Sequence, residues 1–432
     1  MTPEVRDRID QIRQGIVPEG YKKTKSGILP ESWSVRTIAE CLERVEHPVE
    51  VQANEMYTQI GIRSHGKGLF YKEPVTGDSL GNKSVFWIEP DCFILNIVFA
   101  WEQAVGKTTQ AEAGMIGSHR FPMYRPINGS IDIDYLISYL LTKRGTDILE
   151  AASPGGAGRN RTLGQDRFMK SRIVLPPLDE QKKIAEILST QDKAIELQER
   201  KIEELKRFKK GCLEKMFPKK GQKVPEKRFP GFTDDWEQRK VSTIASDTRG
   251  GGTPATSNET YWSGNIPWIQ SSDLSEGKLF GVEPRKYISR DGLNNSATQL
   301  VPENSIAVVT RVGVGKLAFM PFSYTTSQDF LSLCKLQTEP HFTVYALYQM
   351  LQGELQAVQG TSIKGMTKDD LLSKSIFAPK DEVEQQQLGS YFRNLDTLIT
   401  LHQRKLEEMK KQKKALMQLL LTGIVKTKGE VR

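Results

Sequence analysis

Residues 175–217 read LPPLDEQKKIAEILSTQDKAIELQERKIEELKRFKKGCLEKMF, and residues 378–421 read APKDEVEQQQLGSYFRNLDTLITLHQRKLEEMKKQKKALMQLLL. The two stretches align at a constant shift of 204 residues, which places Asp192 on Asp396. Each carries apolar residues in alternating steps of four and three, and a spacing of about 3.5 residues is typical of a coiled-coil seam. The sequence therefore predicts two long helices of the same length and register that bind each other.

The ends and the interruptions of the two helices also match. Each helix is expected to begin after a proline, with acidic residues in its first turn, as helix N-termini prefer. Polar residues interrupt both seams at equivalent places: Gln198 with His402, and Lys209 with Lys413. Polar groups inside a seam specify register and partner, so we expect these positions to fix how the helices pair.

The repeat extends beyond the helices. Residues 163–176 match residues 366–379 at a shift of 203, and Trp236 lies 203 residues after Trp33. The chain is therefore two tandem units of about 203 residues, each with a Trp-containing entry segment, a globular body, a short strand expected to start at Asp166 or Asp369, and a long helix. The domain boundaries that follow are an N-terminal extension (1–29), a first globular domain (30–177), a first scaffold helix (178–217), a linker (218–231), a second globular domain (232–379), a second scaffold helix (380–423) and a tail (424–432).

Between the shared ends the two bodies differ in sequence. Both read as short strands separated by Gly and Pro turns, followed by a helix that we expect at residues 133–152 and 343–358. The fold class is therefore α+β, with two globular domains on an antiparallel two-helix coiled coil. The short linker predicts that the two helices are antiparallel. The domains would then lie at opposite ends of the coiled coil and be related by a pseudo-two-fold axis. One frame holding two unlike bodies suggests two different binding surfaces.

Charge and composition narrow the class of protein. The net charge is +8, but residues 31–177 carry −1 and residues 232–379 carry −2, so a nucleic-acid surface on either domain must come from local clustering. No apolar run reaches the length of a membrane span, and the N-terminus has no signal-peptide core. The four cysteines form no CxxC pair, which favours a reducing cytoplasm.

The motifs of an enzyme are missing from the sequence. Gly106-Lys107-Thr108 resembles the end of a nucleotide-binding loop, but Trp101 stands where that motif needs glycine. The five histidines lack metal-ligand spacing, and no nucleophile–base pair is evident. We therefore expect no catalytic residues, no metal and no cofactor on this chain.

The sequence resembles the specificity subunit of type I restriction-modification systems. The resemblance rests on GGTP…YWSGNIPWI (251–269), on the LPPLDEQKKIA turn (175–185) and on the two long helices, and it covers residues 30–423. The first body departs from the GGTP…YW pattern and resembles another subclass through GIRSHGKG (61–68). The resemblance implies a non-catalytic subunit that chooses a double-stranded DNA sequence. Two methyltransferase subunits and restriction/translocase subunits would then carry S-adenosylmethionine, ATP and magnesium.

Candidate DNA-binding residues follow from the chemistry of recognition. Arg, Lys, Asn, Gln, Ser and Thr read base edges, and basic residues and exposed amides contact phosphates. One glycine-containing, acid-free stretch precedes the repeated strand in each unit, at residues 151–165 in the first and 355–368 in the second. We expect Trp262 and Trp268 to lie in the core. The candidates are Arg63, Ser64, His65, Lys67, Arg159, Asn160 and Arg161 in the first domain, and Arg249, Thr253, Arg311, Lys316, Ser327, Gln328, Lys364 and Lys368 in the second.

Repeated charged residues on the helices are candidates for partner binding. They are Arg200, Lys201, Glu203 and Glu204, with Arg404, Lys405, Glu407 and Glu408 in the second copy. Their repetition predicts two quasi-identical docking sites, and the alternative is a solvated charged face. Two other function classes stay open: a self-sufficient enzyme, and a coiled-coil scaffold that binds nucleic acid without sequence preference. The sequence leaves open the DNA target and the role of residues 1–29.

Overall fold

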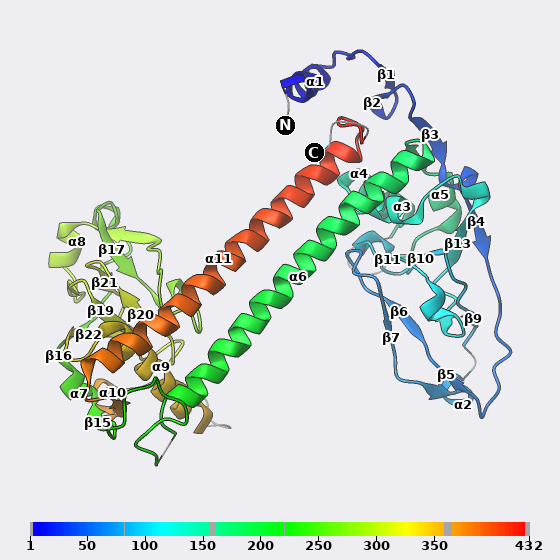
Figure 1. Ribbon diagram of the computed structural model, residues 1–432. Coiled ribbons are helices and arrows are strands. Elements are labelled where there is room, and N and C mark those ends of the chain that lie inside the picture. The colour runs from blue at the N-terminus through cyan, green and yellow to red at the C-terminus, as the bar shows by residue number, and fades with distance from the viewer. Residues whose placement is uncertain (1–2, 82, 156–160, 220, 358–364, 428–432) are drawn as a thin grey trace. The chain divides into compact units, whose positions relative to one another are not determined.

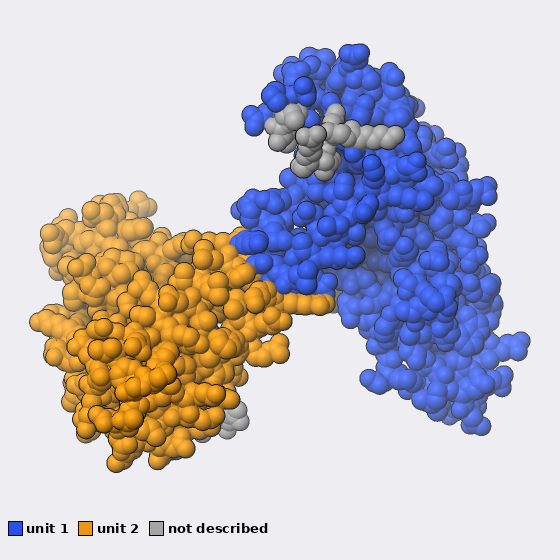
Figure 2. All heavy atoms as spheres, in the orientation of Figure 1, with its two compact units in different colours: residues 1–198, 405–432 blue, residues 199–404 orange. Residues whose placement is uncertain are grey.

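The computed structural model describes the whole chain except residues 1–2, 82, 156–160, 220, 358–364 and 428–432. The chain forms two compact units, one of residues 1–198 with 405–432 and the other of residues 199–404 (Figure 2). Each long helix contributes one half to each unit. The boundaries between the units therefore fall inside the two helices.

The repeated frame is a two-stranded ribbon in each unit. In the first, β3 (Ser34–Thr37) pairs with β14 (Arg172–Leu175), and in the second β15 (Glu237–Lys240) pairs with β23 (Ser375–Ala378), both antiparallel. All four strands are related by the 203-residue shift that the sequence shows. The ribbons are anchored by Trp33 and Trp236, which are 1% and 2% exposed. Burial of so large a side chain is worth about 3–5 kcal/mol against alanine, so the entry segments are structural.

The segment before each frame strand differs from the sequence prediction. Asp166 and Asp369 lie in short helices, α5 (Gln165–Lys170) and α10 (Lys368–Ser373), and the strands begin only at Arg172 and Ser375. The residues at the start of α10 favour a helix, because the Thr367 hydroxyl accepts a hydrogen bond from the backbone amide of Asp370 and acidic residues occupy the first turn. Both features stabilise a helix N-terminus.

The body of the first domain is built around a four-stranded antiparallel sheet. Its order is β11-β10-β13-β4, with smaller two-stranded ribbons beside it. The predicted helix at residues 133–152 is two helices, because the Thr142 hydroxyl caps a new helix by accepting from the Gly145 amide at 3.2 Å. The elements are β4 (Leu42–Val45), β5 (Met56–Tyr57), β6 (Ile60–Ile62), β7 (Leu69–Tyr71), β8 (Val75–Thr76), α2 (Gly77–Leu80), β9 (Val85–Trp87), β10 (Phe93–Leu95), β11 (Val105–Lys107), β12 (Ile116–Ser118), β13 (Met123–Pro126), α3 (Ile133–Leu140) and α4 (Lys143–Ala152).

The second body shares the plan but not the details. It has a four-stranded antiparallel sheet, β16-β22-β19-β20, and a three-stranded sheet, β18-β17-β21, in which β17 and β21 are parallel. One helix, α9, replaces the α3–α4 pair, and it covers the residues predicted as helical up to position 357. The elements are α7 (Val241–Ile244), β16 (Ala245–Gly250), β17 (Ile266–Ile269), β18 (Lys286–Ile288), α8 (Arg290–Asn294), β19 (Ser305–Val309), β20 (Leu317–Met320), β21 (Thr325–Thr326), β22 (Phe330–Leu336) and α9 (Pro340–Ala357).

The two long helices are α6 (Leu178–Met216) and α11 (Glu382–Leu420), each drawn as one continuous rod in Figure 1. Within each unit the N-terminal half of one helix packs on the C-terminal half of the other. In the first unit Leu188 and Leu420 share a core, and in the second Leu213 and Phe392 do. The pairing inside each unit is therefore antiparallel, as predicted. No helix in the described part of the chain is long and apolar enough to cross a membrane.

Equivalent ion pairs join the helices in the two units. Lys209 donates to Asp396 with a 2.5 Å contact, and Lys413, 204 residues after Lys209, donates to Asp192. The surroundings differ, because the Lys209 and Asp396 side chains are 10% and 22% exposed, against 22% and 55% for Lys413 and Asp192. Asp396 also accepts from the hydroxyl of Tyr345 at 2.5 Å. Burial first, and then this carboxylate, raise the pKa of Tyr345, so its proton stays in the bond.

Residues 3–29 pack on the C-terminal segment of the first unit. The helix α1 (Pro3–Arg13) and the hairpin of β1 (Tyr21–Thr24) and β2 (Gly27–Pro30) meet the turn that follows α11. The Tyr21 hydroxyl donates to the carbonyl of Gly423 at 2.9 Å, and Arg8 donates to the carbonyl of Ile424 at 3.0 Å. Gly423 has φ +74°, and a Cβ there would come within 2.6 Å of Pro30. The two ends of the chain are thus joined in one core.

The two ion pairs should differ in their contribution to stability. We expect Lys209→Ala to lower the free energy of unfolding by about 3 kcal/mol, because Asp396 loses its counter-ion in a mostly buried site. The equivalent Lys413→Ala should cost at most about 1 kcal/mol, because Asp192 is solvated. Urea denaturation followed by circular dichroism measures both, and equal costs would show that burial does not govern the pair.

Candidate nucleic-acid interface

The predicted cluster in the first domain lies at the tip of the β6–β7 hairpin. Arg63, His65 and Lys67 are exposed there. Arg63 donates to the Leu69 carbonyl, and its guanidinium lies 5.1 Å from the centre of the Phe70 ring. These contacts hold its cationic end against the hairpin.

The same tip is also tied to a neighbouring turn. The Ser64 hydroxyl donates to the Glu102 carboxylate at 3.0 Å, and the amide of His65 donates to the Glu102 carbonyl at 2.8 Å. His65 adopts a positive φ of 61°. Ser64 is therefore committed to an internal contact, while the exposed cations remain candidates for binding.

The predicted acid-free stretches are only partly within the described residues. Arg159, Asn160 and Lys364 lie outside them. Arg161 is described, and its guanidinium lies 5.4 Å from the centre of the Trp101 ring. Lys368 is the first residue of α10. Arg161 thus lies against the turn that contains Trp101, and Lys368 lies at the start of the helix that precedes β23.

In the second domain the structure joins two of the predicted residues from loops that are 75 residues apart in the sequence. The hydroxyl of Thr253 donates to the carboxamide oxygen of Gln328 at 2.7 Å, and both residues are exposed. Ser327 differs from expectation, because it is 4% exposed and its hydroxyl lies 3.2 Å from Asp329. Ser327 is therefore committed to an internal contact, whereas its neighbour Gln328 is exposed.

The other cations predicted in the second domain have different environments. Arg249 forms an ion pair with Asp247 at 3.0 Å, which offsets its charge. Lys316 lies with its ammonium 3.5 Å from the Ser271 carbonyl, and Arg311 is exposed. Arg311 and Lys316 flank the turn between β19 and β20.

A cavity of about 630 Å³ in the second domain gathers residues that the sequence reading had not selected. It is lined by Thr256, Trp262, Ser263, Gly264, Arg285, Lys286 and Tyr287. The Lys286 ammonium lies 5.6 Å from the centres of the Trp262 and Trp268 rings, which pack edge to face at 5.0 Å. Trp268 is in the core as predicted, but Trp262 is half-exposed in the cavity wall. Cations beside aromatic faces suit nucleic acid.

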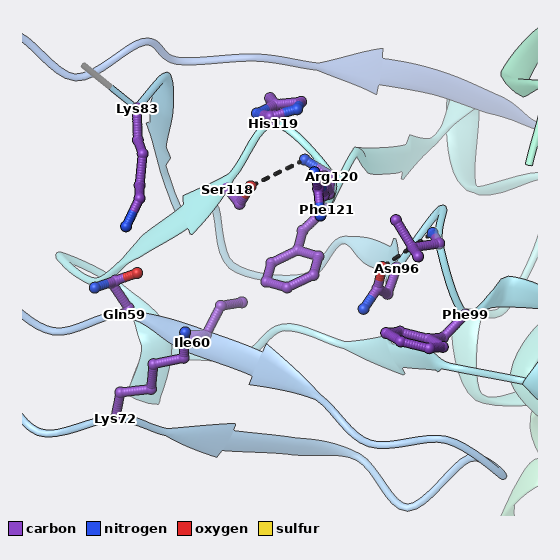
Figure 3. A pocket seen from close by; sticks show the side chains of 11 residues that line it. Gln59, Ile60, Lys72, Lys83, Asn96, Phe99, Ser118, His119, Arg120 and Phe121 are labelled. Carbon is purple, nitrogen blue, oxygen red and sulfur yellow. Dashed lines mark hydrogen bonds between the residues drawn. The ribbon is translucent and has the colours of Figure 1, made fainter. Parts of the chain in front are cut away.

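The first domain has a groove of comparable character. Two adjoining cavities of about 370 Å³ each lie where β6, β7, β9, β10 and β12 end (Figure 3). The cationic residues Lys72, Lys83 and Arg120 line them, with the carboxamides of Gln59 and Asn96. The sequence reading missed this set, because its members come from separate strand ends and share no local motif.

The predicted partner-binding residues are all exposed on the helices. The structure adds two exposed leucines to that pattern, Leu197 and Leu401, which are 64% and 55% exposed and are related by the 204-residue shift. The alignment of the two helices already contains this pattern, because the two leucines occupy equivalent positions beside the repeated charged residues. Singly exposed apolar residues are normal on protein surfaces, so the docking role of the repeated charged residues stays a prediction.

The described residues contain no group of three or more metal-ligating side chains. The four cysteines are free, and three of them are buried. Burial raises the pKa of the Cys334 thiol to about 11, which keeps it protonated and unreactive.

Comparisons with known proteins agree with this geometry. The family model described as "Type I restriction modification DNA specificity domain" matches residues 85–207 and 233–411. The chain is 24% identical over 435 residues to the putative type I restriction enzyme MjaX specificity subunit of Methanocaldococcus jannaschii, covering 95% of this chain and 97% of that one. It is 30% identical over 162 residues to the type I restriction enzyme EcoR124I/EcoR124II specificity subunit of Escherichia coli, covering 34% and 38%.

Solved structures share the fold at low sequence identity. A chain from a type I restriction-modification system, solved to explain complex assembly and conformational transition, superposes with a TM-score of 0.58 at 18% identity, covering 92% of this chain and 99% of that one. The type I specificity subunit of M. genitalium gives a TM-score of 0.54 at 12% identity, covering 90% and 96%.

The cavity of the second domain supports a direct test. We expect Lys286→Gln to weaken binding of duplex DNA and to lower the slope of log affinity against log salt by about 0.9, the value for one lost phosphate contact. Lys286→Arg should keep the slope, because the charge is retained. Fluorescence anisotropy over a salt series measures both, and an unchanged slope in Lys286→Gln would place the cavity away from DNA.

Proposed function

This chain belongs to the type I restriction-modification DNA specificity family, and we propose that its two domains recognise two different halves of one bipartite DNA target. Recognition of DNA targets is the function of this non-catalytic subunit. Our proposal adds that each domain recognises one half of the target.

One observation carries the proposal. The frames of the two units repeat strand for strand at a shift of 203, yet the bodies they hold differ in sheet order, helix number and surface residues. A duplicated frame would present its two bodies to DNA in equivalent ways, and unlike bodies would then read unlike sequences. A scaffold that binds nucleic acid without sequence preference would have no use for that difference.

The helices offer a way to set the distance between the two half-sites. Their seams pair antiparallel inside each unit, with equivalent ion pairs at Lys209 and Lys413. The placement of the two domains at opposite ends of the rod stays a prediction. If it holds, the spacer that neither domain contacts is determined by helix length.

Insertion of one heptad at the centre of both helices tests this arrangement. Seven residues add about 10 Å to a helix, so insertion after Arg200 and after Arg404 should widen the preferred spacer by about 3 base pairs, given about 3.4 Å per pair along one strand. Selection from a random duplex library followed by sequencing measures the spacer. Unchanged half-sites are expected, and an altered half-site sequence would contradict the model.

The chemistry of restriction and modification would reside on partner subunits. We propose two methyltransferase subunits, docked at the repeated surfaces beside Leu197 and Leu401, together with restriction/translocase subunits. S-adenosylmethionine, ATP and magnesium would be bound by those partners. Since the substrate is DNA and the partners are DNA-modifying enzymes, the complex would act in the cytoplasm.

The charge distribution predicts that the partners also contribute DNA affinity. The two domains carry −1 and −2, and neutralised phosphates supply much of DNA affinity. Addition of the methyltransferase subunit should therefore raise affinity for the target by at least about 100-fold and steepen the salt dependence. Anisotropy titrations with and without that subunit measure this, and equal affinities with equal slopes would contradict it.

A further inference from the structure

The groove of the first domain is formed by strand ends that backbone hydrogen bonds hold together. Gln59 precedes β6 and Lys72 follows β7, and the Lys72 amide donates to the Gln59 carbonyl at 2.9 Å. On the opposite wall, the Ile97 amide donates to the Arg120 carbonyl at 3.0 Å. Both walls are thus fixed before any ligand arrives, as a specific binding site requires.

The charge around the groove is positive. Lys72, Lys83 and Arg120 are exposed, and none of the three forms an ion pair within the described part of the chain. The only carboxylate lining either cavity among the described residues is Glu102, which the Ser64 hydroxyl bonds at 3.0 Å. A domain with net charge −1 therefore gathers cations at this groove, which suits a polyanion.

The floor of the groove carries groups that can read base edges. Asn96 is 8% exposed, and its carboxamide oxygen accepts from the Val98 amide at 3.0 Å. That bond fixes the orientation of the amide, so the NH₂ end is the end toward the cavity (Figure 3). Gln59 supplies a second carboxamide on the other wall. Asn and Gln are the residues that pair with the N6 and N7 edge of adenine.

Aromatic side chains complete the lining. The ring of Phe121 lies between Gln59 and Asn96 in Figure 3, and Phe99, which is 37% exposed, lies beside Asn96. Exposed aromatic faces beside cations and carboxamides favour nucleic acid over an acidic peptide, because the faces can contact bases or sugars.

We propose that this groove is the DNA-reading site of the first domain, with Asn96 donating to a purine edge and Lys72, Lys83 and Arg120 contacting phosphates. The inference rests on the proposed function and goes beyond it by naming the residues that read one half-site. It also adds the strand ends to the two first-domain candidates that the sequence offers, the loop with Arg159–Arg161 and the hairpin tip at residues 63–67.

Asn96→Asp is the sharpest test, because it is isosteric. The remaining oxygen keeps the bond from the Val98 amide, and only the NH₂ donor is replaced by a charged acceptor. Full-length chains, wild type and variant, are assembled with the methyltransferase subunit and selected on a random duplex DNA library. Asn96→Asp and Asn96→Ala should each lose preference at one position of one half-site by roughly 10-fold or more, and the other half-site should be unchanged.

The cations are tested against a single-charge control from outside the groove. The triple variant Lys72→Ala, Lys83→Ala, Arg120→Ala should weaken all duplexes alike and lower the salt slope by up to about 3. The control Lys170→Ala removes an exposed charge from α5, outside the groove, and should leave base preferences unchanged and alter the slope by at most one contact. Thermal melts followed by circular dichroism verify that the Asn96 variants remain folded.

The outcomes separate the two levels of the proposal. If the wild type selects a bipartite motif and Asn96→Asp keeps every position of it, the groove assignment is overturned while the proposed function stands. If the wild type selects no bipartite motif, the proposed function itself fails, and the groove with it. Loss of preference in both half-sites would also overturn the assignment, because the groove belongs to one domain.

Discussion

The structure depends on the antiparallel pairing of two helix seams, specified by an ion pair that occurs once in each unit. A slip of one heptad would keep the apolar residues of the two seams facing each other, but Lys209 and Lys413 each need a carboxylate at one height of the facing helix. Asp396 and Asp192 lie at those heights. Each helix contributes one half to each unit. The contacts between the two helices therefore stabilise the core of each unit and also determine which segments of the chain form that core.

The second constraint is the frame ribbon with its tryptophan. Trp33 donates to the Glu180 carboxylate at 3.0 Å, so entry segment and helix are joined in the first unit. In the second unit the equivalent carboxylate, Glu384, binds Arg228 of the linker instead, at 2.6 Å. The frame thus keeps its geometry while its polar contacts change. That tolerance explains how unlike bodies could be held between equivalent ends.

The frame also explains where the proposed recognition surfaces are located. Strand ends project turns beyond the sheets of each body, and turns tolerate sequence change better than the strands that support them. In the first domain those turns make the groove around Asn96, and in the second they make the cavity around Lys286. A subunit whose role is to select sequences benefits from this separation, because new specificities can arise without loss of the core.

The sequence by itself determined the two helices, their register, the 203-residue frame and the family, because periodicity and repetition are local patterns that survive in a single chain. It could not reveal the split into α3 and α4, where one threonine hydroxyl starts a new helix, nor the helical turn at Asp166. It placed Ser327 at the surface, and packing buried it. Only the tertiary structure joined Gln59, Lys72, Asn96 and Arg120 in one groove, because residues from separate strands become neighbours through sheet topology, which no spacing along the chain records.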